Sequence, residues 1–161
     1  MKPFRFVPAL ATALATALAT SLATALVLTA TAASAEMVKY TTQESFEDVI
    51  FGLENAILDE GLVIDSISHI GDMLERTRQD VGSDVNLFAE AKSYSFCSAS
   101  LSREVMEADP MNISFCPYTI FVAVLPDTPD ETMIGYRSFP EGAMQKVEAL
   151  LDGIVKSAIG E

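Results

Sequence analysis

The sequence has little of the side-chain chemistry from which most active sites are built. It contains one histidine, His69, and two cysteines, Cys97 and Cys116. There is no G-x-S-x-G nucleophile motif, no glycine-rich phosphate loop and no H-E-x-x-H zinc motif. Glu107 and Asp109 have no second acidic pair nearby that would indicate a glycosidase. These absences favour a non-catalytic protein, for which we expect no cofactor.

Basic residues are also scarce. The chain has 10 lysines and arginines against 23 aspartates and glutamates, and no acidic residue occurs before position 36. Only eight of the basic residues lie in 36–161, so this part carries a formal net charge of −15, eight against 23. A surface of this sign repels phosphate groups and anionic lipids. The composition therefore disfavours nucleic-acid binding and electrostatic docking to membranes.

The first 35 residues have the pattern of an export signal. Two basic residues precede an apolar run, 7–33, which is built largely from repeats of Ala-Leu-Ala-Thr. The run ends in Ala33-Ser34-Ala35, the small-x-small pattern that signal peptidase recognises. We expect cleavage of 1–35 and a periplasmic or secreted protein without membrane attachment. A retained membrane anchor is the alternative.

Hydrophobic periodicity predicts a single α+β domain over 36–161. The predicted helices cover 46–60, a short segment from Asp72 to Gly82, 99–108, and a C-terminal stretch from Pro140 to about 159. Strands are predicted near 38–40 and at 62–70, 90–97, 115–124 and 132–139. Because the elements alternate at first and end in a hairpin, we expect a two-layer sandwich with helices packed on one face of a mixed β-sheet.

Some apolar residues of the predicted helices bear on packing. Leu74 and Val81 are expected to face inward from the short helix that ends at Gly82. Ser45 and Asp48 have the spacing of a helix cap, and the apolar stripe of the first helix consists of Phe46, Val49, Ile50, Leu53, Ala56 and Ile57. Phe51 and Leu58 lie off this stripe. They are either isolated exposed side chains or part of a homodimer contact.

Three stretches together resemble the domain-of-unknown-function family 302. They are YTTQESFEDVIFGLENAILDEGL (40–62), SYSFCSASLSREVMEADPMNISFCPYTIFV (93–122) and IGYRSF (134–139), so the resemblance covers about 40–139. The Phe-Cys, Asp-Pro and Phe-Cys-Pro-Tyr marks of the family fall on Phe96-Cys97, Asp109-Pro110 and Phe115-Cys116-Pro117-Tyr118. The resemblance implies a small α+β fold and no established reaction.

Cys97 and Cys116 have four interpretations. In an oxidising compartment they would form a disulfide, which closes a loop of about 20 residues and contributes roughly 3 kcal/mol. This bond requires antiparallel neighbouring strands, because parallel ones would place the cysteines at opposite ends of the sheet. A helix beginning after Cys97 would instead lower its pKa and make the pair redox-active. The remaining interpretations are a metal site with His69 and two buried, reduced thiols.

Arg103, Tyr118 and Arg137 lie within the matched stretches and are candidate ligand-binding residues. Each arginine would pair either with an anionic ligand or with a neighbouring carboxylate. The sequence thus predicts an exported, non-catalytic domain that binds a small molecule or a protein partner. The alternatives are a thiol-dependent redox protein that uses Cys97 and Cys116, and a metal-handling protein.

Overall fold

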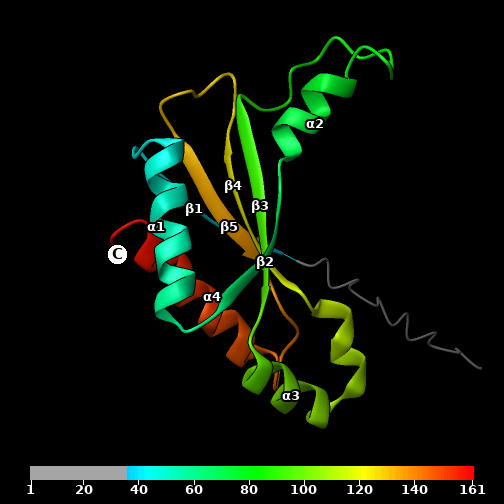
Figure 1. Ribbon diagram of the computed structural model, residues 1–161, viewed down its shortest axis with the longest axis vertical. Helices are drawn as coiled ribbons and strands as arrows, with labels where there is room; N and C mark the ends of the chain where they lie inside the picture. Colours follow the sequence, from blue (N-terminus) through cyan, green and yellow to red (C-terminus); the bar gives the residue numbers. More distant parts are fainter. Residues whose placement is uncertain (1–35) are drawn as a thin grey trace, which may run out of the picture. The chain divides into compact units, whose positions relative to one another are not determined.

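The computed structural model describes residues 36–161, and the expected signal segment lies outside them (Figure 1). The strands are β1 (Met37–Thr42), β2 (Val63–Ser68), β3 (Glu90–Cys97), β4 (Tyr118–Val124) and β5 (Thr132–Arg137). The α-helices are α1 (Phe46–Asp59), α2 (Ile70–Thr77), α3 (Ala99–Ala108) and α4 (Gln145–Ala158), and a 3₁₀ helix covers Pro110–Phe115. None of the described helices has the length and apolar character needed to cross a membrane.

The strands form one sheet in the order β1-β5-β4-β3-β2, and every pairing is antiparallel. The α+β class is confirmed, but the sheet is not mixed as we expected. The segment after Cys97 explains the difference. It stays at one end of the sheet as α3 and the 3₁₀ helix, and it returns the chain to Tyr118, directly beside Phe96 (Figure 1). The next strand therefore runs back along β3.

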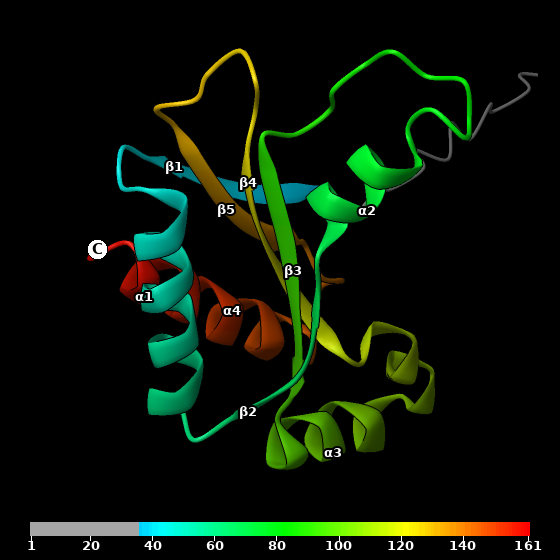
Figure 2. The same ribbon diagram turned by 45° about the horizontal axis from the view of Figure 1, so that its top comes forward.

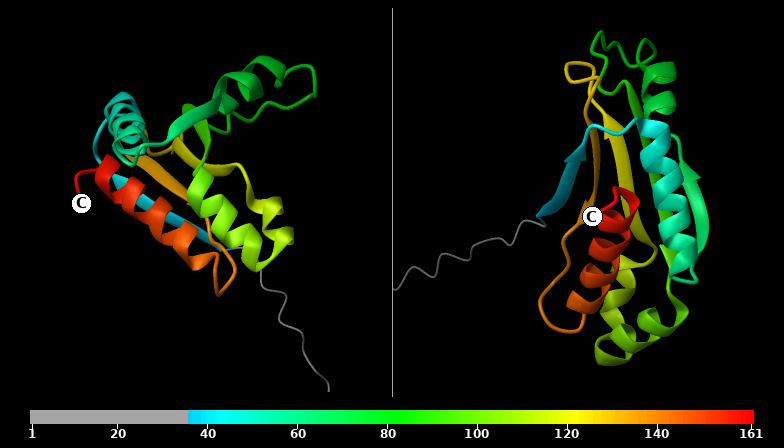
Figure 3. Two further views of the ribbon diagram at one scale, coloured as in Figure 1. Left: turned by 60° about the horizontal axis from the view of Figure 1, so that its bottom comes forward. Right: turned by 90° about the vertical axis from the view of Figure 1, so that its left-hand side faces the viewer.

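Helix α1 forms where its sequence pattern predicts it. The Ser45 hydroxyl accepts a hydrogen bond from the backbone N–H of Asp48 at 3.2 Å and caps the helix. The six apolar residues of the predicted stripe are all buried: Phe46, Val49, Ile50, Leu53, Ala56 and Ile57. In Figures 2 and 3, α1 and α4 lie side by side against one face of the sheet. Gly52 permits this approach, because a Cβ there would overlap the backbone carbonyl of Ala158.

The two faces of the sheet differ in cover. Alternate strand residues are buried beneath the helices and form the inner face, which includes Tyr94, Phe96, Tyr118, Ile120, Val122, Ile134 and Tyr136. The residues between them point to the opposite side, which we call the open face: Met37, Lys39, Thr119, Phe121, Met133 and Arg137. These open-face residues are half-buried or exposed. Helix α2 meets this face at Ile70, which lines a hollow together with Phe121 and Met133 (Figure 3).

Two helix predictions were wrong in detail. Helix α2 starts before Asp72, buries none of its residues, and leaves Val81 beyond its end 75% exposed. It lies against β3 through Gly71, which approaches the backbone of Ala91, and not through an apolar stripe. Helix α4 starts at Gln145 and not at Pro140, because Gly142 adopts a left-handed φ of 92° that interrupts a helix.

Candidate functional site

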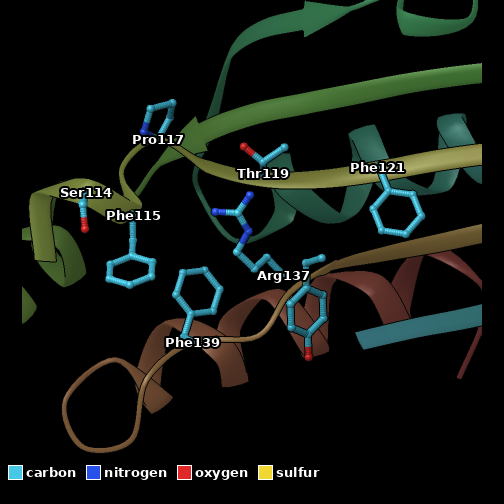
Figure 4. A pocket seen from close by; sticks show the side chains of 8 residues that line it. Ser114, Phe115, Pro117, Thr119, Phe121, Arg137 and Phe139 are labelled. Atoms are coloured by element: carbon cyan, nitrogen blue, oxygen red, sulfur yellow. The ribbon is translucent and has the colours of Figure 1, made fainter. Parts of the chain in front are cut away.

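A cavity at one end of the open face is lined by polar and aromatic side chains. The cavity has a volume of about 310 Å³ and lies between the 3₁₀ helix, the start of β4 and the end of β5 (Figure 4). Its lining residues are Ser114, Phe115, Pro117, Thr119, Phe121, Tyr136, Arg137 and Phe139.

Strand alternation places the polar residues of the cavity. Ile120 of β4 pairs with Tyr136 of β5, and both are buried on the inner face. Thr119 and Arg137 stand one step beyond this pair, so their side chains point to the open face. Figure 4 shows Arg137 directed into the cavity toward Thr119.

Aromatic rings form one wall of the cavity and fix its shape. The rings of Phe115 and Phe139 lie 5.7 Å apart, and Phe139 makes an edge contact with Tyr118 at 6.1 Å. The backbone N–H of Phe139 donates to the Glu148 carboxylate at 2.6 Å, and the Gln145 side chain donates to the Phe139 carbonyl at 3.1 Å. Helix α4 thus holds Phe139 in place from behind.

Arg137 is the one charged side chain among the described residues that line the cavity. Within 36–161, its guanidinium makes no ion pair or side-chain hydrogen bond. Arg78 and Arg103, in contrast, each contact a glutamate at 2.9 Å. In a domain with a large excess of acidic residues, a free arginine beside aromatic rings is a local positive site.

The other two candidate ligand-binding residues lie elsewhere. Arg103 is exposed on α3 and pairs with Glu107, which is the salt bridge that the sequence offered as an alternative. Tyr118 is buried on the inner face, and a hydrogen bond of 2.9 Å joins its hydroxyl to Ser102. Burial raises the pKa of Tyr118. Of the three residues, the structure brings only Arg137 into the cavity.

Cys97 and Cys116 lie at the same end of the antiparallel β3–β4 pair, and both are free thiols. Burial, the neighbouring Cys116 side chain and the charge of Asp65 raise the pKa of Cys97 to about 12. The expectation of a low-pKa thiol is therefore wrong, because these effects outweigh that of the helix that begins at Ala99.

His69 does not join the cysteines. It precedes α2, is exposed, and lies 3.6 Å from the carboxylate of Asp72. Among residues 36–161, no cluster of three histidine, cysteine or acidic side chains is arranged to hold a metal ion.

A second polar cluster ties α4 to the sheet. The Asp152 carboxylate accepts hydrogen bonds from Tyr40 at 2.5 Å, Lys156 at 2.7 Å and Tyr136 at 3.1 Å. The bonds from Lys156 and Tyr40 lower the pKa of Asp152, while burial and Asp152 raise that of Tyr136. These shifts favour an ionised Asp152 and a protonated Tyr136 at neutral pH, which indicates a structural role for the cluster. No sequence spacing predicted this cluster, because Tyr40 and Asp152 are 112 residues apart.

Comparison with known proteins gives one family and one fold. The family model described as "Domain of unknown function DUF302" matches residues 38–156. No curated protein matches the chain significantly. The structure resembles the crystal structure of an uncharacterized conserved DUF302 protein from Bacillus stearothermophilus, with a TM-score of 0.54 and 16% identity. The match covers 77% of this chain and 95% of that one. At this identity, the likeness shows the α+β fold alone.

Proposed function

The chain belongs to the DUF302 family, whose function is unknown, and we propose that it binds a small aromatic anion in the cavity around Arg137. The observation that carries the proposal is a guanidinium without a protein partner in 36–161, set beside a wall of phenylalanine rings. The expected ligand is a small molecule with a negative charge and a flat apolar body.

The charge of the ligand follows from Arg137. A guanidinium presents its N–H donors in a planar fork that matches the two oxygens of a carboxylate. No carboxylate of the described lining competes for it. Ser114 and Thr119 belong to the same lining, and a hydroxyl is a neutral donor that suits a second anionic oxygen.

The apolar body of the ligand follows from the rings. Phe115, Phe121 and Phe139 offer faces and edges to a planar group, and aromatic pairs favour offset or edge-to-face contact. The cavity volume of about 310 Å³ lies at the small end of ligand pockets, which span roughly 300–1,000 Å³. A single aromatic ring with one acidic group, such as benzoate, has the required chemistry.

Binding is favoured over turnover by the composition of the lining. Ser114 and Thr119 are the two residues of the lining that could act as hydroxyl nucleophiles. The lining includes no histidine, carboxylate or lysine that would activate either hydroxyl as a general base. Cys97 is a poor catalytic nucleophile, because a pKa raised to about 12 keeps most of this thiol protonated at neutral pH.

Titration calorimetry with benzoate and the neutral benzamide tests the proposal. We expect benzoate to bind and benzamide to bind much more weakly, because only the first has a charge for Arg137. Arg137→Gln should lower the affinity for benzoate by about 10- to 100-fold, since a hydrogen bond to a charged group contributes about 1.5–3 kcal/mol. Arg103→Gln is the matched control and should leave the affinity unchanged. Equal binding of both probes, or an equal loss in both variants, would overturn the proposal.

A further inference from the structure

We infer that Cys97 and Cys116 are a site of covalent modification, where an intramolecular disulfide forms and fixes the wall of the cavity. Formation of the bond is independent of the ligand. Its effect on binding rests on the proposed function of the cavity.

The sheet register brings the two sulfurs together. Phe96 pairs with Tyr118, so Cys97 stands one residue beyond this pair and Cys116 two residues before it. Cys97 thus lies opposite Pro117, and Cys116 is its diagonal neighbour. With strands about 5 Å apart and a rise of about 3.4 Å per residue, diagonal Cα atoms lie on the order of 6 Å apart, which is within the range that a disulfide bridges. The Cys116 side chain lies close enough to Cys97 to contribute to its raised pKa. This geometry removes the obstacle that a parallel pairing would have posed.

The surroundings favour the bonded form over a thiolate. The sulfurs lie beside buried side chains, and Ser102 contacts Cys116 at 3.9 Å while it bonds the Tyr118 hydroxyl at 2.9 Å. Both cysteines are half-buried. A disulfide carries no charge, so this site accommodates it without the desolvation that an ionised sulfur would require. The site therefore suits a stable bond and not a catalytic thiol.

The bond would act on the cavity through the residues next to Cys116. Phe115 and Pro117 flank this cysteine in the chain, and both line the cavity. The segment between the cysteines consists of α3 and the 3₁₀ helix, which carries Ser114 and Phe115. A Cys97–Cys116 bond joins the two ends of this segment, and it thereby restricts the movement of the aromatic wall.

The chemistry requires an oxidant, which we take to be the disulfide of a thiol–disulfide exchange partner. One cysteine attacks this disulfide as a thiolate, forms a mixed disulfide and displaces one thiolate of the partner. The second cysteine then attacks the mixed disulfide, forms the Cys97–Cys116 bond and displaces the other thiolate. The protein loses two electrons and two protons, and the partner is reduced to two thiols. Such exchange is favoured in the oxidising compartment that the sequence predicts.

Oxidised glutathione and intact-mass measurement test the bond on the folded protein. We expect wild type to become lighter by two hydrogens, with a Cys97–Cys116 crosslink in the peptide map and without bound glutathione. Cys97→Ser and Cys116→Ser should each fail to lose the two hydrogens and should instead retain one glutathione. Glutathione on both cysteines of wild type, or oxidation only after denaturant is added, would overturn the inference.

Benzoate binding then separates the bond from the proposed function. With the bond formed, we expect benzoate to dissociate more slowly than from the reduced protein, and Cys116→Ser should show no change with oxidant. If benzoate binds neither form while the crosslink appears, the proposed function fails and the bond stands. If benzoate binding depends on Arg137 but is equal with and without the crosslink, the effect on the wall is refuted.

Discussion

The two faces of the sheet are built from the same strands and differ in the burial of their large side chains and in hydrogen bonding. On the inner face, Ile120, Val122 and Ile134 are fully buried beneath α1 and α4. On the open face, their neighbours Phe121 and Met133 are half-buried at most. Because successive residues of a strand point to opposite sides, a shift of one position separates a core residue from a surface residue.

The polar groups differ in the same way. On the inner face, the hydroxyls of Tyr94, Tyr118 and Tyr136 are all hydrogen-bonded, to Glu54, Ser102 and Asp152. On the open face, Arg137 has no such partner among the described residues. The chemistry of the inner face is used in folding, whereas that of the open face is free for a ligand. The comparison therefore predicts that mutations on the two faces have different effects.

The largest effect is expected from truncation of adjacent residues of β5. Ile134→Ala removes a fully buried side chain and should lower the free energy of unfolding by about 2–5 kcal/mol. Met133→Ala, one residue away on the open face, should lower it by about 1 kcal/mol or less. Urea denaturation measures both, and the midpoint should move without a change in slope. Equal losses would mean that the open face is as tightly packed as the inner one.

A smaller effect is expected in the helix layer that makes the inner face. Gly52→Ala places a methyl group against the carbonyl of Ala158, so α1 and α4 must separate. We expect a loss of about 1–3 kcal/mol in the free energy of unfolding. Gly153→Ala is the control, because a Cβ there meets no atom within 4 Å. It should stabilise the protein by about 1 kcal/mol through helix propensity. Stabilisation by both changes would show that the helices do not touch at Gly52.

The sequence predicted the inner face better than the open one. Helix α1 was predicted with its cap and its buried stripe, because both depend on residues three or four positions apart. The inward packing of Val81 was predicted wrongly, whereas Leu74 is half-buried. Helix α2 is short and contacts β3 through a glycine, and the hydrophobic pattern alone contains no information on that contact.

The candidate site was predicted only in part. Arg137 was a candidate because it lies within a stretch that resembles the family, but the aromatic wall was not foreseen. Phe115 was assigned to a strand, and it lies instead in the 3₁₀ helix, where it meets the ring of Phe139. Likewise, whether Cys97 and Cys116 are neighbours depends on strand direction, which the sequence left open. The aromatic wall and the proximity of the two cysteines both depend on how distant strands pair, and the spacing of residues along the chain does not determine that pairing.

The smallest effect is expected from Tyr94, and it depends on pH. Burial, together with the hydrogen bond to Glu54, raises the pKa of Tyr94 above the value of about 10 in an unfolded chain. Above pH 10 the unfolded state therefore loses this proton first, and the free energy of unfolding falls as pH rises. Tyr94→Phe should cost about 1 kcal/mol at neutral pH through the lost hydrogen bond. It should also make the decline above pH 10 shallower, though not abolish it, because the pKa of Tyr136 is raised as well.

Urea denaturation at several pH values between neutral and strongly alkaline measures both effects. Parallel stability curves for wild type and variant would mean that the Tyr94 hydroxyl is not buried on the inner face, and the contrast between the two faces would lose its electrostatic part.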